Sequence, residues 1–298
     1  MQLAKNLAVE AIMLILILSF LALMPAMAKA QNDAEFPKAS IRGTHVRKIT
    51  SSIVKQEYEI HISLPKGYAD SDEIYPVMYL LDSDISFGMM YQIYWPLEFG
   101  GAVQKFIIVG IGGYGDKDQD LFYGRSRDYT PTEVSREKLG GAAKIIPVSG
   151  GASDFLDFVQ KELCPFIESE YRVNPAERCL AGASLGGLFC MYALFHAPDF
   201  FNRYIVISPS LWWDNRLIFD YEKAYSKKYT SLVAHIYLSM GAMEPEFMLN
   251  NWHEMIDILR SRDYNGLEIT SHLFDEEIHV SVGPAAFTRG MRAVFPPE

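Results

Sequence analysis

Residues 178–187 read RCLAGASLGG, and this stretch decides the fold because it predicts a strand, a sharp turn and a helix in direct succession. Its centre, GASLG at 182–186, fits the pattern G-x-S-x-G. In that pattern, small neighbours let the strand and helix backbones approach closely and expose the serine hydroxyl. Ser184 is therefore the candidate nucleophile. Because so short a pattern also occurs by chance, the rest of the chain has to support it.

Strand and helix patterns alternate on both sides of this stretch. Apolar runs predict strands, and apolar residues at helical spacing predict helices that pack on them. Such an order is typical of an open, mostly parallel central sheet with helices on both faces, as in the α/β-hydrolase fold. The predicted strands are 52–54, 58–64, 77–81, 106–111, 204–208, 232–238 and 269–274; the predicted helices are 87–99, 151–172, 188–197, 247–262 and 283–295; residues 116–151 are expected to form a long polar loop.

The composition narrows the class of protein. The chain has 298 residues, 49% of them hydrophobic, which is enough for a large core in one domain. A formal net charge of −10 argues against a general nucleic-acid binder, which needs a basic face to neutralise phosphates. The three cysteines, Cys164, Cys179 and Cys190, are expected to be buried and unpaired. No metal-ligand spacing is present, and no cofactor is expected.

The first thirty residues have the pattern of a secretory signal peptide. Lys5 precedes an apolar run at 11–24, and AKA at 28–30 fits an A-x-A cleavage site, with AMA at 26–28 as the alternative. We expect a single catalytic domain over 31–298, located in the periplasm or secreted, without stable membrane insertion after cleavage. A retained N-terminal membrane anchor is the competing interpretation, although the run is shorter than the ~20 residues that span a bilayer.

Candidate catalytic residues follow three of the predicted strands. Ligands bind beyond the carboxyl ends of the strands in such sheets, so the residue after each strand is informative. Ser184, Glu244 and His279 follow in the order that the α/β-hydrolase arrangement requires. His279 would act as the base that activates the serine, and Glu244 would orient the imidazole.

The assignment of the acid has more alternatives than the assignment of the base. Of the seven histidines, only His279 is expected in a loop between a strand and a helix. For the acid, Glu246 is the main rival of Glu244, and Asp275 and Glu276 are less suitable because of their place in the strand order. A solvated acidic loop would explain all of these carboxylates without catalysis.

An oxyanion hole requires two backbone N–H donors, one of them from the residue after the nucleophile. We expect these donors at Leu185 and at Asp84 or Ser83, which follow the predicted strand 77–81. If Asp84 is used, its carboxylate must point away from the developing negative charge.

Several motifs together resemble a known family. SLPKGY at 63–68, the segment from YP at 75–76 to Asp82, the GASLG turn, SPSLWW at 208–213 and His279 before a final helix look like the putative-esterase group of α/β-hydrolases. That group includes esterase D, the antigen 85 acyltransferases and the enterobactin-type siderophore esterases, and the last branch looks closest. The resemblance covers about residues 40–298 and implies a compact esterase with Ser184 as nucleophile and His279 as base.

The same resemblance suggests substrate contacts. Arg125 and Arg127 are candidates to hold a carboxylate or stack on a catechol ring, since guanidinium groups are planar cations. Arg127 pairing with Asp128 is the structural alternative. One of Trp212 and Trp213 is a candidate wall of the acyl pocket, with core packing as the alternative.

The function that follows is a serine carboxylic-ester hydrolase that acts through an acyl-enzyme on small esters, with siderophore lactones as one substrate class. An acyltransferase that uses the same acyl-enzyme is one alternative. A noncatalytic binding module on the same fold is the other.

Overall fold

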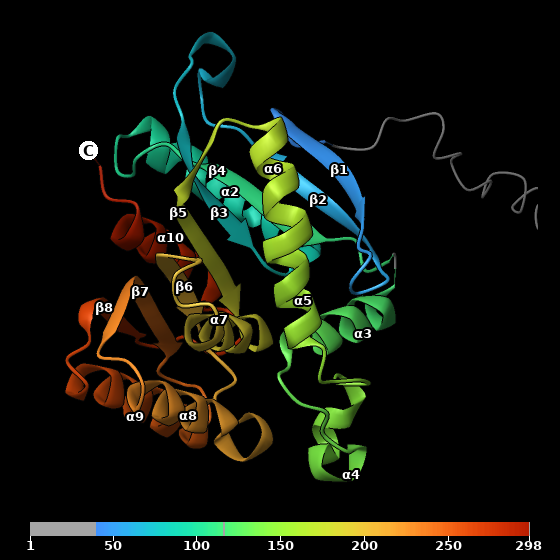
Figure 1. Cartoon of the computed structure of the whole chain (residues 1–298), viewed down its shortest axis with the longest axis vertical. Coiled ribbons are helices and arrows are strands. Elements are labelled where there is room, and N and C mark those ends of the chain that lie inside the picture. The colour runs from blue at the N-terminus through green and yellow to red at the C-terminus, as the bar shows by residue number, and fades with distance from the viewer. Residues whose placement is uncertain (1–39, 116, 298) are drawn as a thin grey trace, which may run out of the picture. The chain divides into compact units, whose positions relative to one another are not determined.

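The centre of the molecule is a mixed sheet of eight strands in the order β1-β2-β4-β3-β5-β6-β7-β8 (Figure 1). The computed structural model describes residues 40–115 and 117–297, and residues from Gly43 onward form one unit. The first two pairings, β1 with β2 and β2 with β4, are antiparallel, and every later pairing is parallel. The strands are β1 Thr44–Thr50, β2 Glu57–Ser63, β3 Tyr75–Leu80, β4 Ile107–Gly112, β5 Val173–Ala183, β6 Arg203–Ile207, β7 Ser231–Gly241 and β8 Asn265–Phe274.

The burial of each strand agrees with its sequence. All residues of β3 and β4 are buried, as expected for central strands covered on both faces. No residue of the outer strand β1 is buried, and β8 is the opposite edge strand, with four residues exposed in its first six. The predicted α/β fold with a mostly parallel central sheet is therefore confirmed.

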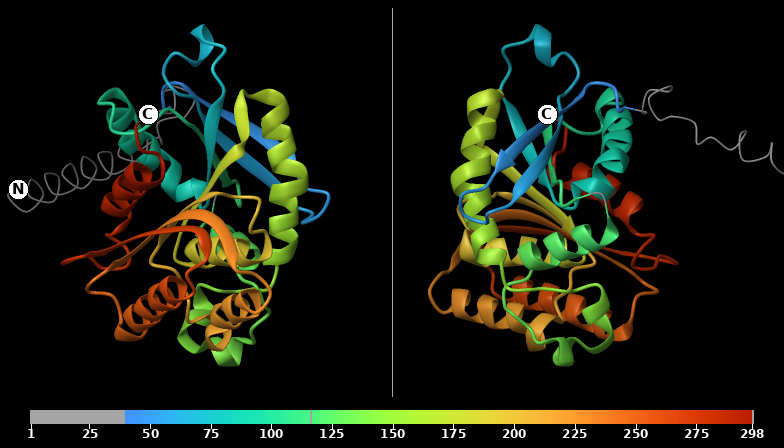
Figure 2. Two further views of the ribbon diagram at one scale, coloured as in Figure 1. Left: turned by 60° about the vertical axis from the view of Figure 1, so that its left-hand side comes forward. Right: turned by 90° about the vertical axis from the view of Figure 1, so that its right-hand side faces the viewer.

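Helices cover both faces of the sheet (Figure 2). On one face lie α2 and α10, which contact each other and the strands beneath them. On the other face, α7 packs on β5 and β6, and α3, α5 and α8 pack around it. The helices are α2 Ser83–Phe99, α3 Asp118–Tyr129, α4 Arg136–Leu139, α5 Ala152–Phe158, α6 Cys164–Glu170, α7 Leu185–His196, α8 Trp213–Ser226, α9 Glu246–Ser261 and α10 Gly283–Val294, with short helical turns η1 Tyr68–Asp70, η2 Gly140–Lys144 and η3 Val159–Leu163.

The expected long loop at 116–151 is wrong in its first half. That half forms the twelve-residue helix α3, and its inward face carries Gly124, Ser126, Asp128 and Tyr129. The sequence of α3 is polar, so no apolar stripe marks it as a helix. Its burial depends instead on ion pairs and hydrogen bonds to residues far away in the chain, such as Asp82 and Tyr58.

Two smaller expectations also differ from the structure. The predicted strand at 52–54 is part of the turn between β1 and β2. Helix α2 begins at Ser83, four residues before the expected start at 87, and runs through Pro96 to the expected end at Phe99.

The predicted signal peptide at 1–30 lies outside the described residues. Within the described residues, no helix is both long enough and apolar enough to cross a bilayer. All three cysteines are buried and unpaired, as expected. Burial raises the pKa of the Cys164 thiol to about 12, so this group is an inert part of the core.

Candidate active site

Ser184 lies at a tight turn between β5 and α7. Its backbone has φ 58° and ψ −117°, a conformation that costs energy for a residue with a Cβ and persists only where the surroundings enforce it. The Ser184 N–H donates to the carbonyl of Ile207 (2.9 Å), and the N–H of Ser210 donates to the carbonyl of Ser184 (3.0 Å). The turn is therefore held from the neighbouring strand β6.

The flanking glycines are required by close contact. A Cβ on Gly182 would lie 2.7 Å from backbone atoms of Gly186, and a Cβ on Gly187 would lie 3.0 Å from Cα of Pro209. The first distance is shorter than real Cβ contacts, and the second is at the short limit of what they show. Glycine at 182 therefore lets β5 and α7 pack against each other, and glycine at 187 lets α7 approach the segment after β6.

His279 lies in the segment between β8 and α10, and its ring joins the serine to the acid. Its Nε2 atom is 3.0 Å from Oγ of Ser184, and its Nδ1 atom is 2.7 Å from Oε2 of Glu244. The three residues come from sequence positions up to 95 apart and form one hydrogen-bonded chain. In this arrangement the imidazole can accept the serine proton at Nε2 while Nδ1–H donates to the carboxylate.

The carboxylate of Glu244 is buried and fully hydrogen-bonded. Its Oε1 atom accepts from the N–H of Gly241 (3.0 Å) and from the hydroxyl of Ser208. Burial acts to raise the pKa of Glu244, but the hydrogen bonds with His279, Ser208 and Gly241 outweigh it, so that the pKa is lowered. Glu244 is thus held as the anion that a neighbouring imidazolium requires.

The other carboxylates do not join this chain. Glu246 is exposed at the first residue of α9, and Asp275 and Glu276 are exposed beyond β8. Ser208, by contrast, donates to Glu244 and is an additional residue of the site that was not among the candidates from the sequence. It follows β6 and has φ 45°, so its place at the carboxyl end of a strand was the available signal.

The expected oxyanion donors lie next to the turn. The N–H of Leu185 is the first of α7, and the N–H groups of Ser83 and Asp84 are the first of α2, where N–H groups have no partner within a helix. The carboxylate of Asp84 accepts from the N–H of Gly113 at 2.9 and 3.0 Å. The hydroxyl of Ser83 is 2.7 Å from Nδ1 of His61. Both side chains are therefore engaged with β2 and the end of β4.

Comparison with known proteins agrees with this geometry. The sequence profile of the family described as "Putative esterase" matches residues 51–265. The chain belongs to this esterase family. Ferri-bacillibactin esterase BesA of Bacillus subtilis is 32% identical over 272 residues, which cover 87% of this chain and 92% of BesA.

Two solved structures are also similar. The BES protein from Bacillus cereus has a TM-score of 0.75 and 29% identity over 87% of this chain and 97% of its own. The IroE-like serine hydrolase from Shewanella oneidensis has a TM-score of 0.74 and 30% identity over 85% and 80%. The family and these relatives support ester hydrolysis by this chain.

Arg125 of the esterase reaches from α3 to the turn before α2. Its Nε and Nη2 atoms donate to both carboxylate oxygens of Asp82, at 2.8 and 3.0 Å, and both side chains are largely buried. Burial acts to lower the pKa of Arg125, but Asp82 outweighs it and the pKa is raised. The backbone of Asp82 is left-handed (φ 54°), and its N–H donates to the hydroxyl of Tyr129 (3.0 Å). Arg125 and Tyr129 thus both hold the turn that leads into α2.

Arg127 pairs with Asp128, as the structural alternative anticipated. The Arg127 Nε atom is 2.6 Å from Oδ1 of Asp128, and the hydroxyl of Tyr58 donates to Oδ2 of the same carboxylate (2.7 Å). These contacts occupy polar groups of both arginines. The expected contact of Arg125 and Arg127 with substrate stays a prediction.

The two tryptophans have different environments. Trp213 is 1% exposed, and its Nε1–H donates to the hydroxyl of Thr132 (3.1 Å). Trp212 is half-buried and meets the ring of Phe247 edge-on, with ring centroids 6.5 Å apart. Trp213 therefore joins α8 to the segment after α3. Trp212 is the one that keeps an accessible face, and its role as a wall of the acyl pocket stays a prediction.

Proposed function

We propose that this esterase is a serine hydrolase that cleaves small carboxylic esters through an acyl-enzyme, with ester bonds of siderophores as the substrate class. The observation that carries the proposal is the hydrogen-bonded chain from Ser184 through His279 to Glu244. A serine hydroxyl becomes nucleophilic when a base takes its proton, and the imidazole at 3.0 Å is within reach to do so.

The reaction divides into two halves. Oγ of Ser184 attacks the ester carbonyl while Nε2 of His279 takes the proton, and the negative charge forms on the carbonyl oxygen. The N–H of Leu185 and that of Asp84 or Ser83 would stabilise this oxyanion. Collapse of the intermediate breaks the bond to the alcohol, which receives the proton from His279. Water then attacks the acyl-enzyme by the same route, and the free acid leaves.

The anionic state of Glu244 supports its proposed role. Imidazolium forms at His279 in each half of the reaction, and the lowered pKa of Glu244 keeps a negative charge beside Nδ1 at neutral pH. The siderophore class is supported by the name of the Bacillus subtilis relative, a ferri-bacillibactin esterase.

The test is the rate of hydrolysis of short-chain p-nitrophenyl esters by the wild type, by Ser184→Ala and by Ser261→Ala. Loss of the nucleophile is expected to lower kcat by about 10⁴-fold or more. Ser261 is an exposed serine at the end of α9, so its variant should retain the wild-type rate. Equal rates for the wild type and Ser184→Ala would exclude Ser184 as the nucleophile.

The substrate class needs a separate measurement. We expect kcat/KM for a siderophore trilactone to exceed that for acetyl and feruloyl esters of the same enzyme preparation. Product analysis with an added alcohol acceptor distinguishes hydrolysis from acyl transfer, because transfer yields a new ester in place of the free acid.

A further inference from the structure

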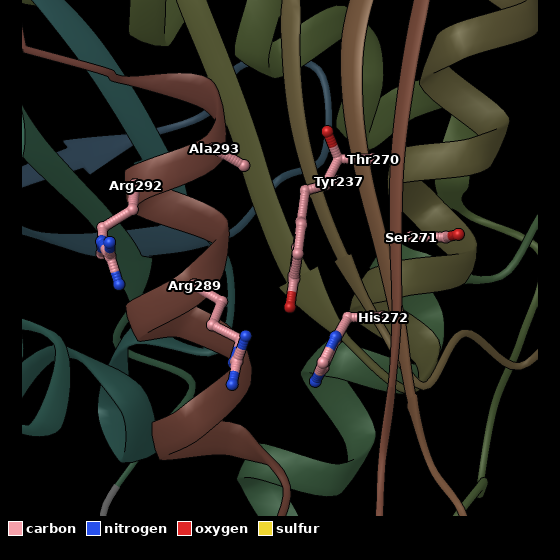
Figure 3. A pocket seen from close by; sticks show the side chains of 7 residues that line it. All are labelled: Tyr237, Thr270, Ser271, His272, Arg289, Arg292 and Ala293. Atoms are coloured by element: carbon pink, nitrogen blue, oxygen red, sulfur yellow. The ribbon is translucent and has the colours of Figure 1, made fainter.

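A polar cavity lies away from Ser184, between helix α10 and the edge strand β8 (Figure 3). Its volume is about 250 Å³. Arg289 and Arg292 line it from α10, Thr270 and His272 from β8, and Tyr237 from β7. None of the hydrogen bonds of Ser184, Glu244 or His279 involves these residues.

The cavity results from the way in which α10 packs on the sheet. A Cβ on Gly290 would lie 2.7 Å from Ile205 on β6 and 3.0 Å from the ring of Tyr237 on β7, so the helix lies directly on these two strands. Strand β8 is one strand farther out. Its residue Thr270 is in register with Tyr237, so both side chains are on the face that α10 covers only in part. Tyr237 is therefore the floor of a groove with α10 and β8 as its walls.

The hydroxyl of Tyr237 is a buried donor without a partner. The residue is 1% exposed, and within the described part of the chain its Oη atom has no partner in good hydrogen-bond geometry, although the Ser239 hydroxyl is near enough to lower its pKa. Its Oη end points between the side chains of Arg289 and His272 (Figure 3). Burial raises the pKa of Tyr237 to about 12, against the opposing effects of Ser239 and Arg289, so the phenol keeps its proton at neutral pH. Buried polar groups are nearly always hydrogen-bonded, so this one suits a ligand acceptor.

The charge of the groove is positive, although the chain as a whole carries −10. Six other arginines of the described chain form ion pairs with carboxylates. Arg289 and Arg292, over the same described residues, have no carboxylate within ion-pair distance, and no acidic residue lines the cavity. The Arg289 side chain extends toward Tyr237 and His272, whereas that of Arg292 turns to the other side of α10 (Figure 3). Arg289 is therefore the cation that an anion in the groove would meet directly.

We propose that this groove binds a small oxyanion, the phosphate or carboxylate group of a ligand. Guanidinium groups match such groups through paired N–H donors. Arg289 would supply these donors from the α10 side, and the Tyr237 hydroxyl would donate from the floor. The imidazole of His272 completes the polar lining on the β8 side, and Thr270 has less to offer because its hydroxyl is 3.2 Å from Nε2 of His235. The volume suits a single oxyanion group and is below the usual size of a pocket for a drug-sized molecule.

The proposal goes beyond ester hydrolysis and does not depend on it. It concerns the elements on either side of His279, because β8 ends at Phe274 and α10 begins at Gly283. An anion in the groove would contact both elements at once.

The test is calorimetric titration of the full-length protein with inorganic phosphate and, separately, with acetate, at an ionic strength held constant with sodium chloride. We expect saturable binding of at least one anion at one site. Arg289→Gln should weaken it about tenfold or more, since it removes a charge-assisted contact. Arg292→Gln should weaken it less, because this side chain turns away from Tyr237. Tyr237→Phe, which removes only the hydroxyl, should weaken it several-fold. A tighter phosphate titration would indicate a phosphoryl ligand, and a tighter acetate titration a carboxylate.

The matched control is Arg47→Gln, which makes the same charge change in β1 at the opposite edge of the sheet. Its affinity should equal that of the wild type. The proposal is overturned by the absence of saturable binding for both anions, or by equal weakening in Arg47→Gln and Arg289→Gln. Ester hydrolysis at the wild-type rate verifies that Arg289→Gln is folded, so unchanged anion affinity in this variant would also overturn the proposal.

Discussion

At the scale of single residues, the candidate site depends on a serine with a strained backbone conformation and on a glutamate with a buried carboxylate. Ser184 has φ 58°, and Ser208 next to it on the neighbouring strand has φ 45°. Residues with a Cβ rarely adopt this region, and such outliers cluster at functional sites where the surrounding structure enforces them. Here the enforcement comes from hydrogen bonds between the two turns, of which Ser210 N–H to the carbonyl of Ser184 is one.

The identity of the acid can be tested by replacing each of two nearby glutamates. Glu244→Gln keeps the shape of the side chain but removes the charge beside His279, and the amide can fix the wrong imidazole tautomer. We expect kcat for ester hydrolysis to fall by about 10²- to 10⁴-fold. Glu246→Gln is the matched control, because this residue is exposed at the start of α9, and its kcat should stay within about twofold.

The measurement is steady-state kinetics of both variants on one p-nitrophenyl ester, with circular dichroism to verify folding. A large loss in Glu246→Gln alone would assign the acid to that residue instead. Comparable rates for Glu244→Gln and the wild type would mean that the hydrogen bond to His279 contributes little to catalysis.

At the scale of elements, helix α3 is joined to the turn before α2 by a buried ion pair. Arg125 and Asp82 have side chains 13% and 7% exposed, and the pair is bidentate. The first residues of α2, which follow Asp82 directly, carry the expected oxyanion donors. The pair therefore fixes the position of α3 relative to the site, whether or not Arg125 also meets a substrate.

Removing one partner of this pair should destabilise the protein strongly. Arg125→Met leaves the Asp82 carboxylate buried without its cation, which costs about 3 kcal/mol in comparable cases. The double variant Asp82→Asn with Arg125→Met should recover much of this loss, because no buried charge is left unpaired. The measurement is the free energy of unfolding in urea for both single variants and the double variant.

An exposed ion pair provides the control for this cycle. Lys161 and Asp157 pair at 2.8 Å but are 62% and 42% exposed, so Lys161→Met should change the free energy of unfolding by less than about 1 kcal/mol. Additive effects of Asp82→Asn and Arg125→Met would contradict the coupling. A rise in KM for a siderophore ester in Arg125→Lys, with unchanged stability, would assign Arg125 to substrate as well.

At the scale of the whole molecule, the sequence predicts the parts of the fold that depend on local pattern. The strand expected at 106–111 corresponds to β4, Ile107–Gly112, because its residues are apolar without interruption. The order of Ser184, Glu244 and His279 along the chain is enough to predict that they meet, since each follows a parallel strand. Their hydrogen bonds in the structure agree with that expectation.

Features that depend on contacts between distant residues were not predictable in this way. Helix α3 has a polar sequence. It is stabilised by Asp82, which pairs with Arg125 at a separation of 43 residues, and by Tyr58, which donates to Asp128 at a separation of 70 residues. The contact of Ser208 with Glu244 joins the ends of two strands 36 residues apart. Likewise, the groove between α10 and β8 exists because Gly290 seats the helix on β6 and β7, and no local pattern contains that information.

The stability of the whole molecule should depend on pH through partly buried histidines. His235 on β7 has a side chain 25% exposed, and burial lowers its pKa, with Arg203 acting in the same direction and Glu268 against it. The unfolded chain therefore binds a proton at this residue more readily than the folded one. By linkage, the contribution is absent well above pH 6.5 and becomes destabilising as the pH falls through about 6.5.

We expect the melting temperature of the wild type to fall between pH 7.5 and pH 5.5, and His235→Gln to reduce that fall because it removes the titrating group. His45→Gln, at an exposed position on β1, is the matched control and should leave the fall unchanged. The measurement is thermal unfolding of the three proteins at both pH values in buffers of equal ionic strength. An identical fall in the wild type and His235→Gln would show that His235 has the same proton affinity folded and unfolded, which the burial of its ring on β7 argues against.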